Sequence, residues 1–358
     1  MTQTETTTAP DQQALAQARA EELDRLRTQQ AFDPSAYNAF MLAKALWRNG
    51  RYDESLAQFE RASELAPLAP DGHLALVRAA IMLGRLDAAQ AHLARAEAAC
   101  PPLPELAIHR AQLLAADAPA AARDALAGHR DDALAALFHD ALDALAEGRA
   151  PAARTDLPAQ YAAMWSGLHW LAGQPGAALV GCPSQVLERA VAAARLDGPV
   201  LECGVYFGRS LTLLAGLAGQ DVHGFDSFQG APDDGAAGGA MDSTAGVLPE
   251  VPDNARLHAG WFDDTLPAFL AAHPGPVRLL HVDCALHASA ASVLRHAGGR
   301  LVPGSVLLFG NFIGDPGGDA DEFRAWREFA QARGLRWRVL AGTLLGREVA
   351  LAIEDGAA

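Results

Sequence analysis

A turn motif that recurs after 34 residues constrains the fold of this chain more than any other feature. Residues 49–53 read Asn-Gly-Arg-Tyr-Asp, and residues 83–87 read Leu-Gly-Arg-Leu-Asp. The same shift places Pro67 on Pro101. Self-similarity at a period of about 20–50 residues is the signature of stacked repeats. We therefore predict a repeat array in the N-terminal half.

Each repeat has helix-ending residues at the positions expected for two helices joined by a tight turn. A helical pattern over residues 37–48 stops before Gly50, and a second pattern over residues 53–65 stops before Pro67. Proline cannot continue a helix, because it lacks the N–H group and clashes with the preceding turn. Small residues at Ala43 and Ala62 would let the two helices approach closely. The repeat is therefore predicted to be a helical hairpin.

This pattern resembles tetratricopeptide repeats (TPRs), clearly over residues 34–104 and in degenerate form over residues 105–127. The alternative interpretation is an unrelated Ala- and Leu-rich helical hairpin. Because such stacks need about three units to be stable, we expect helices at 12–29 and 131–147 to cap the array.

The chain of 358 residues is long enough for two domains. A Pro- and Ala-rich segment after Gly148 breaks the helical pattern and marks a boundary. We expect a disordered N-terminus at 1–13, an all-α TPR-like domain at 14–150, a connector at 151–183 and a second domain at 184–358.

The second domain alternates helical segments with apolar, β-branched runs, which predicts a Rossmann-like parallel α/β sheet of seven strands. The last two runs are separated by seven residues, which is too short for a helical crossover, so they should form an antiparallel hairpin at one edge of the sheet. The predicted strands are 200–203, 222–226, 257–260, 277–283, 305–309, 336–340 and 348–353.

A glycine-rich segment at residues 201–210 joins the first strand to the next helix. Gly204 and Gly208 permit a tight turn and a close approach to a ligand. A dinucleotide fingerprint would have Gly where this chain has Glu202, which disfavours an NAD-type oxidoreductase. The E-x-G-x-x-x-G form is instead associated with sites for S-adenosylmethionine (SAM).

Asp226 ends the second strand, where a carboxylate can accept hydrogen bonds from both ribose hydroxyls of a nucleoside. The alternative for Asp226 is a simple cap or turn residue. The candidate SAM-binding residues are Glu202, Gly204, Tyr206, Gly208, Ser210, Asp226 and Ser227.

Four strings resemble the macrocin O-methyltransferase family of class I SAM-dependent methyltransferases, which act on small molecules and sugars. They lie at residues 202–210, 225–230, 260–267 and 281–284. The resemblance implies transfer of a methyl group from SAM to a hydroxyl of a small molecule, sugar or glycan. It also implies a divalent metal such as Mg²⁺.

The chain departs from that family at the metal ligands. Asp283 matches the acid after the fourth strand, but Ala285 and His287 replace the second acid and the tyrosine. Gly310 and Asn311 replace an acidic pair after the fifth strand. Asp283 and Asn311 are the candidate metal ligands, and one carboxylate with one amide makes a poor Mg²⁺ site.

Two hypotheses follow from this departure. In one, transfer is independent of metal, Asp283 and His287 are the catalytic residues, and His287 or His281 is the general base. In the other, the domain is a catalytically degenerate methyltransferase-like scaffold or SAM-binding interaction protein. Residues 230–253, rich in Gly, Ala, Asp and Pro, are expected to form a lid or to bind the acceptor.

The formal net charge of −15, without a block of Lys or Arg, disfavours nucleic acid and anionic membranes as partners. Four widely spaced cysteines and the lack of a signal-like N-terminus favour a cytoplasmic protein. We expect the repeats to present a protein partner, a carrier-bound acceptor or a second subunit in a homo-oligomer.

Overall fold

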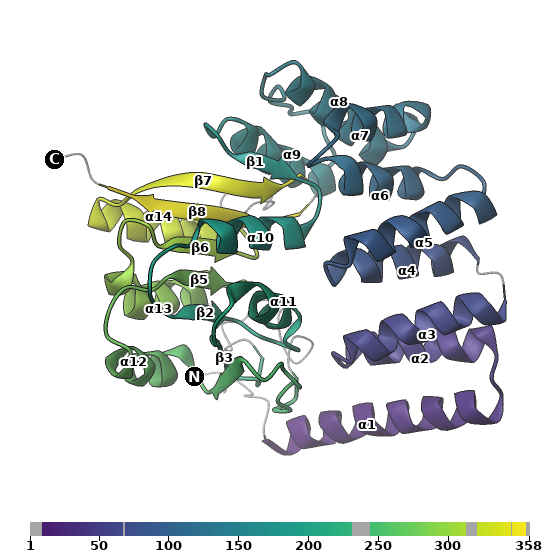
Figure 1. Ribbon diagram of the computed structural model, residues 1–358, viewed down its shortest axis with the longest axis horizontal. Coiled ribbons are helices and arrows are strands. Elements are labelled where there is room, and N and C mark those ends of the chain that lie inside the picture. The colour runs from purple at the N-terminus through teal and green to yellow at the C-terminus, as the bar shows by residue number, and fades with distance from the viewer. Residues whose placement is uncertain (1–8, 67–68, 231–243, 313–320, 345, 356–358) are drawn as a thin grey trace, which may run out of the picture.

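A computed structural model of the chain describes residues 9–66, 69–230, 244–312, 321–344 and 346–355. Antiparallel helices of the N-terminal half stack along one side of the molecule, and an α/β domain lies beside them (Figure 1). No helix within these described ranges combines the length and the apolar character needed to cross a membrane.

The N-terminal helices form the predicted hairpins. Residues 105–127, the degenerate third unit, form the pair α6 and α7, and α1 and α8 flank the array. Helix α1 begins at Ala9, so residues 9–13 are helical and not disordered as predicted; residues 1–8 lie outside the described part. The helices are α1 (Ala9–Phe32), α2 (Ala36–Arg48), α3 (Tyr52–Leu65), α4 (Pro70–Met82), α5 (Leu86–Ala99), α6 (Pro104–Leu114), α7 (Pro119–Leu126) and α8 (Ala133–Ala146).

Small residues and left-handed glycines shape the repeat. Ala43 and Ala62 are fully buried, and the hydroxyl of Ser55 donates a 2.7 Å hydrogen bond to the carbonyl of Ala43, which ties α3 to α2. Gly50 and Gly84 end their helices with φ of 71° and 66°, values that favour glycine. The local sequence thus sets the hairpin geometry.

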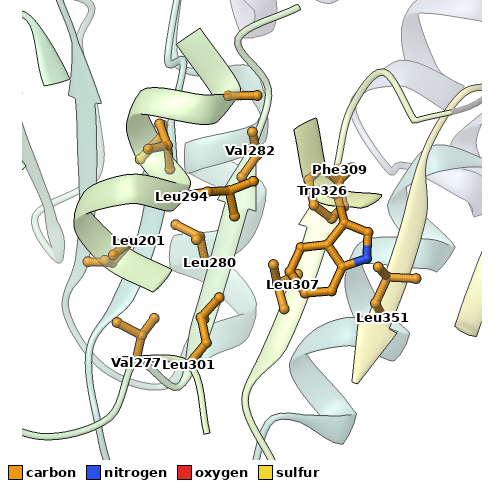
Figure 2. Packing of buried hydrophobic residues seen from close by; sticks show 14 of the residues in the cluster. Leu201, Val277, Leu280, Val282, Leu294, Leu301, Leu307, Phe309, Trp326 and Leu351 are labelled. Carbon is orange, nitrogen blue, oxygen red and sulfur yellow. The ribbon is translucent and has the colours of Figure 1, made fainter. Parts of the chain in front are cut away.

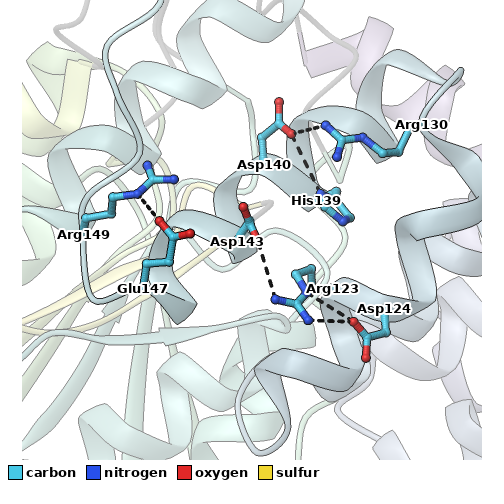
Figure 3. Close-up of polar contacts among 8 residues, drawn as sticks. All are labelled: Arg123, Asp124, Arg130, His139, Asp140, Asp143, Glu147 and Arg149. Atoms are coloured by element: carbon cyan, nitrogen blue, oxygen red, sulfur yellow. Dashed lines mark hydrogen bonds and ion pairs between the residues drawn. The ribbon is translucent and has the colours of Figure 1, made fainter.

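The outer surface of α7 and α8 carries several ion pairs (Figure 3). Arg123 lies 3.5 Å from Asp143 and links the two helices, and Arg130 lies 2.6 Å from Asp140. These side chains are largely exposed, so each pair contributes at most about 1 kcal/mol. Buried apolar contacts therefore hold this end of the array together.

Among the described residues, the sheet has eight strands in the order β1-β7-β8-β6-β5-β2-β3-β4. The prediction of seven strands missed β1, a three-residue strand in the predicted connector that pairs with β7 in parallel. Strand β8 lies between β6 and β7 and is antiparallel to both, so the predicted hairpin forms but is not at the edge. The strands are β1 (Ala178–Val180), β2 (Val200–Cys203), β3 (Val222–Asp226), β4 (Ala255–Ala259), β5 (Leu279–Val282), β6 (Val306–Phe309), β7 (Arg336–Thr343) and β8 (Val349–Glu354).

Helices cover both faces of the sheet, and alternate strand residues enter opposite cores. Val200 packs on the side of α10 and α11, whereas Leu201 packs on the side of α12, α13 and α14. Figure 2 shows the second of these cores, in which Trp326 is fully buried. The helices are α10 (Pro183–Ala193), α11 (Arg209–Ala218), α12 (Phe262–Ala272), α13 (His287–Ala297) and α14 (Asp321–Arg333).

The predicted connector is part of both cores and not a separate linker. Its helix α9 (Ala159–Ala172) places Trp165 in the core of the last helical pair, and Leu171 in the core of the sheet. Strand β1 follows directly and joins the sheet. The α/β domain therefore begins before residue 184. The predicted boundary lies too late in the chain because a three-residue edge strand is too short to leave a sequence pattern.

Candidate active site

The parallel strands β2, β3, β5 and β6 end at one edge of the sheet, where the candidate residues converge. The N–H of Gly204 donates to the carbonyl of Phe225, and the N–H of Asp283 donates to the carbonyl of Cys203, each at 2.9 Å. Neighbours β3 and β5 lie on opposite sides of β2, so the chain reverses its winding here. Ligands of open α/β sheets bind in the crevice at such a switch point.

The glycine-rich loop takes a conformation that depends on its glycines. Gly204 has φ of 97°, and a side chain there would overlap the backbone carbonyl of Asp283. Gly208 has φ of 78° and is the N-cap of α11. Between them Tyr206 has φ of 52° and is exposed. The loop therefore brings backbone close to the edge and presents an aromatic side chain beside it.

Asp226 anchors this loop as well as facing the crevice. Its Oδ2 accepts the N–H groups of Val205 and Tyr206 at 2.8 and 2.9 Å, and its Oδ1 accepts that of Phe228 at 2.7 Å. A carboxylate has about four acceptor positions, so about one remains for a ligand hydroxyl. Ser227 differs, because its hydroxyl serves the local turn, accepting from Gln229 and donating to Gly230.

Glu202 and Ser210 form a buried polar cluster below the loop. Glu202 is fully buried, and it accepts from the Ser210 hydroxyl at 3.1 Å and pairs with Nδ1 of His281 at 2.8 Å. Burial raises the pKa of Glu202. Burial also opposes protonation of His281, but the hydrogen bond to Glu202 and the nearby acidic charges together outweigh it and raise the histidine pKa. His281 is thus a partnered core histidine, and Glu202 supports the loop from beneath.

Asp283 lies across the end of β6, where the sequence has Gly310. Its Oδ1 accepts a hydrogen bond of 3.1 Å from the amide of Asn311, and a side chain at position 310 would overlap the carboxylate. Glycine at position 310 therefore leaves room for Asp283 to reach over to the neighbouring strand.

Glu322 is a site residue that the sequence analysis missed. It is fully buried at the start of α14, and its carboxylate accepts the N–H groups of Cys284, Ala285 and Asn311 at 2.8 to 3.0 Å. Burial and the nearby charge of Asp283 raise its pKa to about 7. An acid at a helix start normally indicates an exposed residue, so no local signal identified this one.

These side chains do not fit a divalent metal. Backbone N–H groups take three of the about four acceptor positions of the Glu322 carboxylate, and Asn311 presents N–H and not oxygen to Asp283. Mg²⁺ requires several oxygen ligands in near-octahedral geometry. Within the described ranges, no group of three or more His, Cys, Asp or Glu side chains is arranged to hold a metal ion.

His287 is the first residue of α13, and its Nε2 lies 2.9 Å from Oε2 of Glu328. A neutral imidazole that donates from Nε2 has Nδ1 as its basic nitrogen. The structure thus pairs His287 with an acid on α14, and no hydrogen bond joins it to Asp283 among the contacts of the described residues.

A cavity of about 730 Å³ lies between the repeats and the α/β domain. Its walls include Tyr52 and Arg85 from the repeats, Phe207 and Arg209 beside the glycine-rich loop, and Leu248. Leu248 belongs to segment 230–253, which we expected to form a lid or to bind the acceptor. Thr244 and residues 247–252 of this segment line the cavity, whereas residues 231–243 lie outside the described part.

Comparison with known families agrees with this division. Residues 201–312 match a family model described as a methyltransferase domain, which spans the glycine-rich loop, Asp226, Asp283 and Asn311. The chain contains a methyltransferase domain. Residues 40–104 match a tetratricopeptide repeat model, which confirms the repeats. With β1 set aside, the sheet of the methyltransferase domain has the predicted class I arrangement.

Several solved structures are similar to the chain at low identity. The O-methyltransferase NovP is 20% identical, with 48% of this chain and 78% of NovP covered and a TM-score of 0.39. The calicheamicin methyltransferase CalS11 is 19% identical, with 72% and 95% covered and a TM-score of 0.39. TomG of Streptomyces achromogenes, solved with SAM, is 20% identical, with 56% and 92% covered and a TM-score of 0.34. No curated protein matches the chain.

Proposed function

We propose that this protein is a SAM-dependent O-methyltransferase that acts on a hydroxyl of a small molecule, sugar or glycan. The observation that carries the proposal is the convergence of the glycine-rich loop, Asp226 and Asp283 at one switch point of the sheet. The match of residues 201–312 to a methyltransferase domain supports it.

SAM supplies an electrophilic methyl group on a sulfonium ion, so the protein has to bind it, align an acceptor oxygen and remove one proton. The glycines of the loop at 204–208 would let its backbone approach SAM closely, and the remaining acceptor position of Asp226 would take a ribose hydroxyl. The acceptor oxygen bonds to the methyl carbon as the carbon–sulfur bond breaks, and S-adenosylhomocysteine (SAH) leaves.

We propose that Nδ1 of His287 is the general base that accepts the proton of the acceptor hydroxyl. Glu328 would hold the imidazole through Nε2 and stabilise the imidazolium that forms. Asp283, fixed by Asn311, would orient the acceptor hydroxyl at the strand edge. This route uses no metal, in keeping with the donor set present.

The cavity beside the loop supports a small-molecule acceptor. Its volume of about 730 Å³ lies within the range of about 300–1,000 Å³ found for small-ligand pockets. Apolar walls and several arginine side chains meet in it. We propose that it holds the part of the acceptor that does not react.

Calorimetric titration with SAM and SAH, with EDTA or Mg²⁺, tests the cofactor site. Asp226→Asn should weaken binding about tenfold or more, because a hydrogen bond to a charged group contributes about 1.5–3 kcal/mol. Asp221→Asn is the matched control, since Asp221 precedes the same strand and, among the ion pairs of the described residues, pairs only with exposed Arg256. The wild type should bind equally with EDTA and Mg²⁺. A folded wild type that binds neither ligand would refute the proposal.

The second candidate is a SAM-binding scaffold that has lost transfer activity. The observation that favours it is that the described residues contain no metal donor set, because the macrocin-like resemblance implies metal-assisted transfer. Binding of SAM without turnover across a panel of hydroxyl acceptors would support this candidate. Metal-independent turnover of any acceptor would exclude it.

A further inference from the structure

The turns of the repeats dock on the methyltransferase domain and do not face solvent. Gly50, in the turn between α2 and α3, lies so close to Phe207 that an added Cβ would be 2.5 Å from the Cβ of Phe207. Gly84, one repeat later, lies against Ser184 and Leu213. The guanidinium of Arg209 donates a 3.0 Å hydrogen bond to the carbonyl of Met82. Consecutive repeats thus contact the same domain with equivalent turns.

These contacts reach the loop that we propose to bind SAM. Phe207 lies between Gly204 and Gly208 and is buried. Its ring packs edge-on against Tyr206, with centroids 4.5 Å apart. The N–H of Tyr206 in turn donates to Asp226 at 2.9 Å. A continuous path of contacts therefore runs from the repeat turn through the side chain of Phe207 to Tyr206, whose backbone N–H contacts the proposed ribose acid.

We propose that the repeat region positions the SAM-binding loop, with Gly50 as the positioning residue that accepts the Phe207 ring. This inference rests on the proposed function and adds a role for the repeats beyond partner binding. A side chain at position 50 would displace Phe207, and the loop backbone would move with it. Besides its positive φ, the turn between α2 and α3 thus has a second reason to lack a side chain, and this reason lies outside the repeat itself.

The repeat offers a matched control for the backbone cost of the substitution. Gly50 has φ of 71°, so alanine there is strained whatever its surroundings. Gly148, which ends α8, has φ of 70°, and an added Cβ there would meet nothing within 4 Å. Gly50→Ala and Gly148→Ala therefore carry the same backbone strain, and they differ in the contact with the methyltransferase domain.

The experiment measures SAH affinity by calorimetry and amide hydrogen exchange of residues 204–210 in the full chain. Gly50→Ala should weaken SAH binding by about threefold to thirtyfold, the range of couplings carried by packed contacts. It should also speed exchange in the loop. Gly148→Ala should change neither. Because Phe207→Gly removes both the Cβ and the ring that an alanine at position 50 would overlap, the affinity loss of Gly50→Ala should shrink in that background.

The outcomes separate this inference from the proposed function. If the wild type binds SAH and the two alanine variants have equal affinity and equal loop exchange, the repeats do not position the loop. If the wild type does not bind SAH, the proposed function fails. In that case faster exchange confined to Gly50→Ala would still support the structural coupling, and unchanged exchange would refute it.

Discussion

Replacing Glu322 with glutamine tests whether this buried acid holds the active-site loops. Its carboxylate accepts three backbone N–H groups, two from the loop after β5 and one from Asn311 after β6. Glutamine has one acceptor oxygen, which can keep the pair after β5, so its NH₂ group would face the N–H of Asn311. An unpaired buried donor costs about 1–3 kcal/mol. We therefore expect Glu322→Gln to lower the free energy of unfolding by about 1–3 kcal/mol at pH 5.

The loss of unfolding free energy caused by Glu322→Gln should be smaller at pH 8 than at pH 5, because proton binding by Glu322 differs between the folded and unfolded states. The pKa of Glu322 is raised to about 7, so between about pH 4.5 and 7 the folded state holds a proton that the unfolded state has released. The wild type therefore loses stability as pH rises through this window. Glutamine has no such proton and avoids the buried charge beside Asp283, which offsets part of the lost hydrogen bond.

Urea denaturation of both proteins at pH 5 and pH 8 measures these differences. Glu328→Gln is the matched control on the same helix, since Glu328 is exposed and pairs only with His287 among the described contacts. Its effect should stay within about 0.5 kcal/mol. The reasoning is refuted if Glu322→Gln behaves like this control, or if its cost grows from pH 5 to pH 8.

Two further predictions concern the core and the base. Trp326→Ala should cost about 3–5 kcal/mol in thermal unfolding, because the indole is fully buried. Trp326→Phe should cost less, since Nε1 is a buried donor without a partner among the described residues; an equal cost would contradict this. His287→Ala should lower kcat by about 100-fold or more with SAH affinity retained, and an unchanged initial rate would exclude it as the base.

The sequence determined the repeat, the alternation of strands and helices, and the glycine-rich loop. These features are encoded locally, because left-handed turns require glycine and proline ends helices. Gly50, Gly84, Gly204 and Gly208 all have positive φ, as their positions in the motifs imply. The residues of the loop and Asp226 then meet because parallel neighbouring strands end at one edge.

The tertiary structure decided the features that depend on contacts distant along the chain. Glu322 reaches the β5 and β6 loops from a helix 37 to 38 residues away from the first of them, and Asp283 leans over Gly310 from another strand. Strand β1 could not be predicted from the sequence, because three residues are too few to show the alternating hydrophobic pattern of a strand. The docking of Gly50 on Phe207 was equally invisible, because a turn glycine looks the same in sequence whether it faces solvent or a second domain.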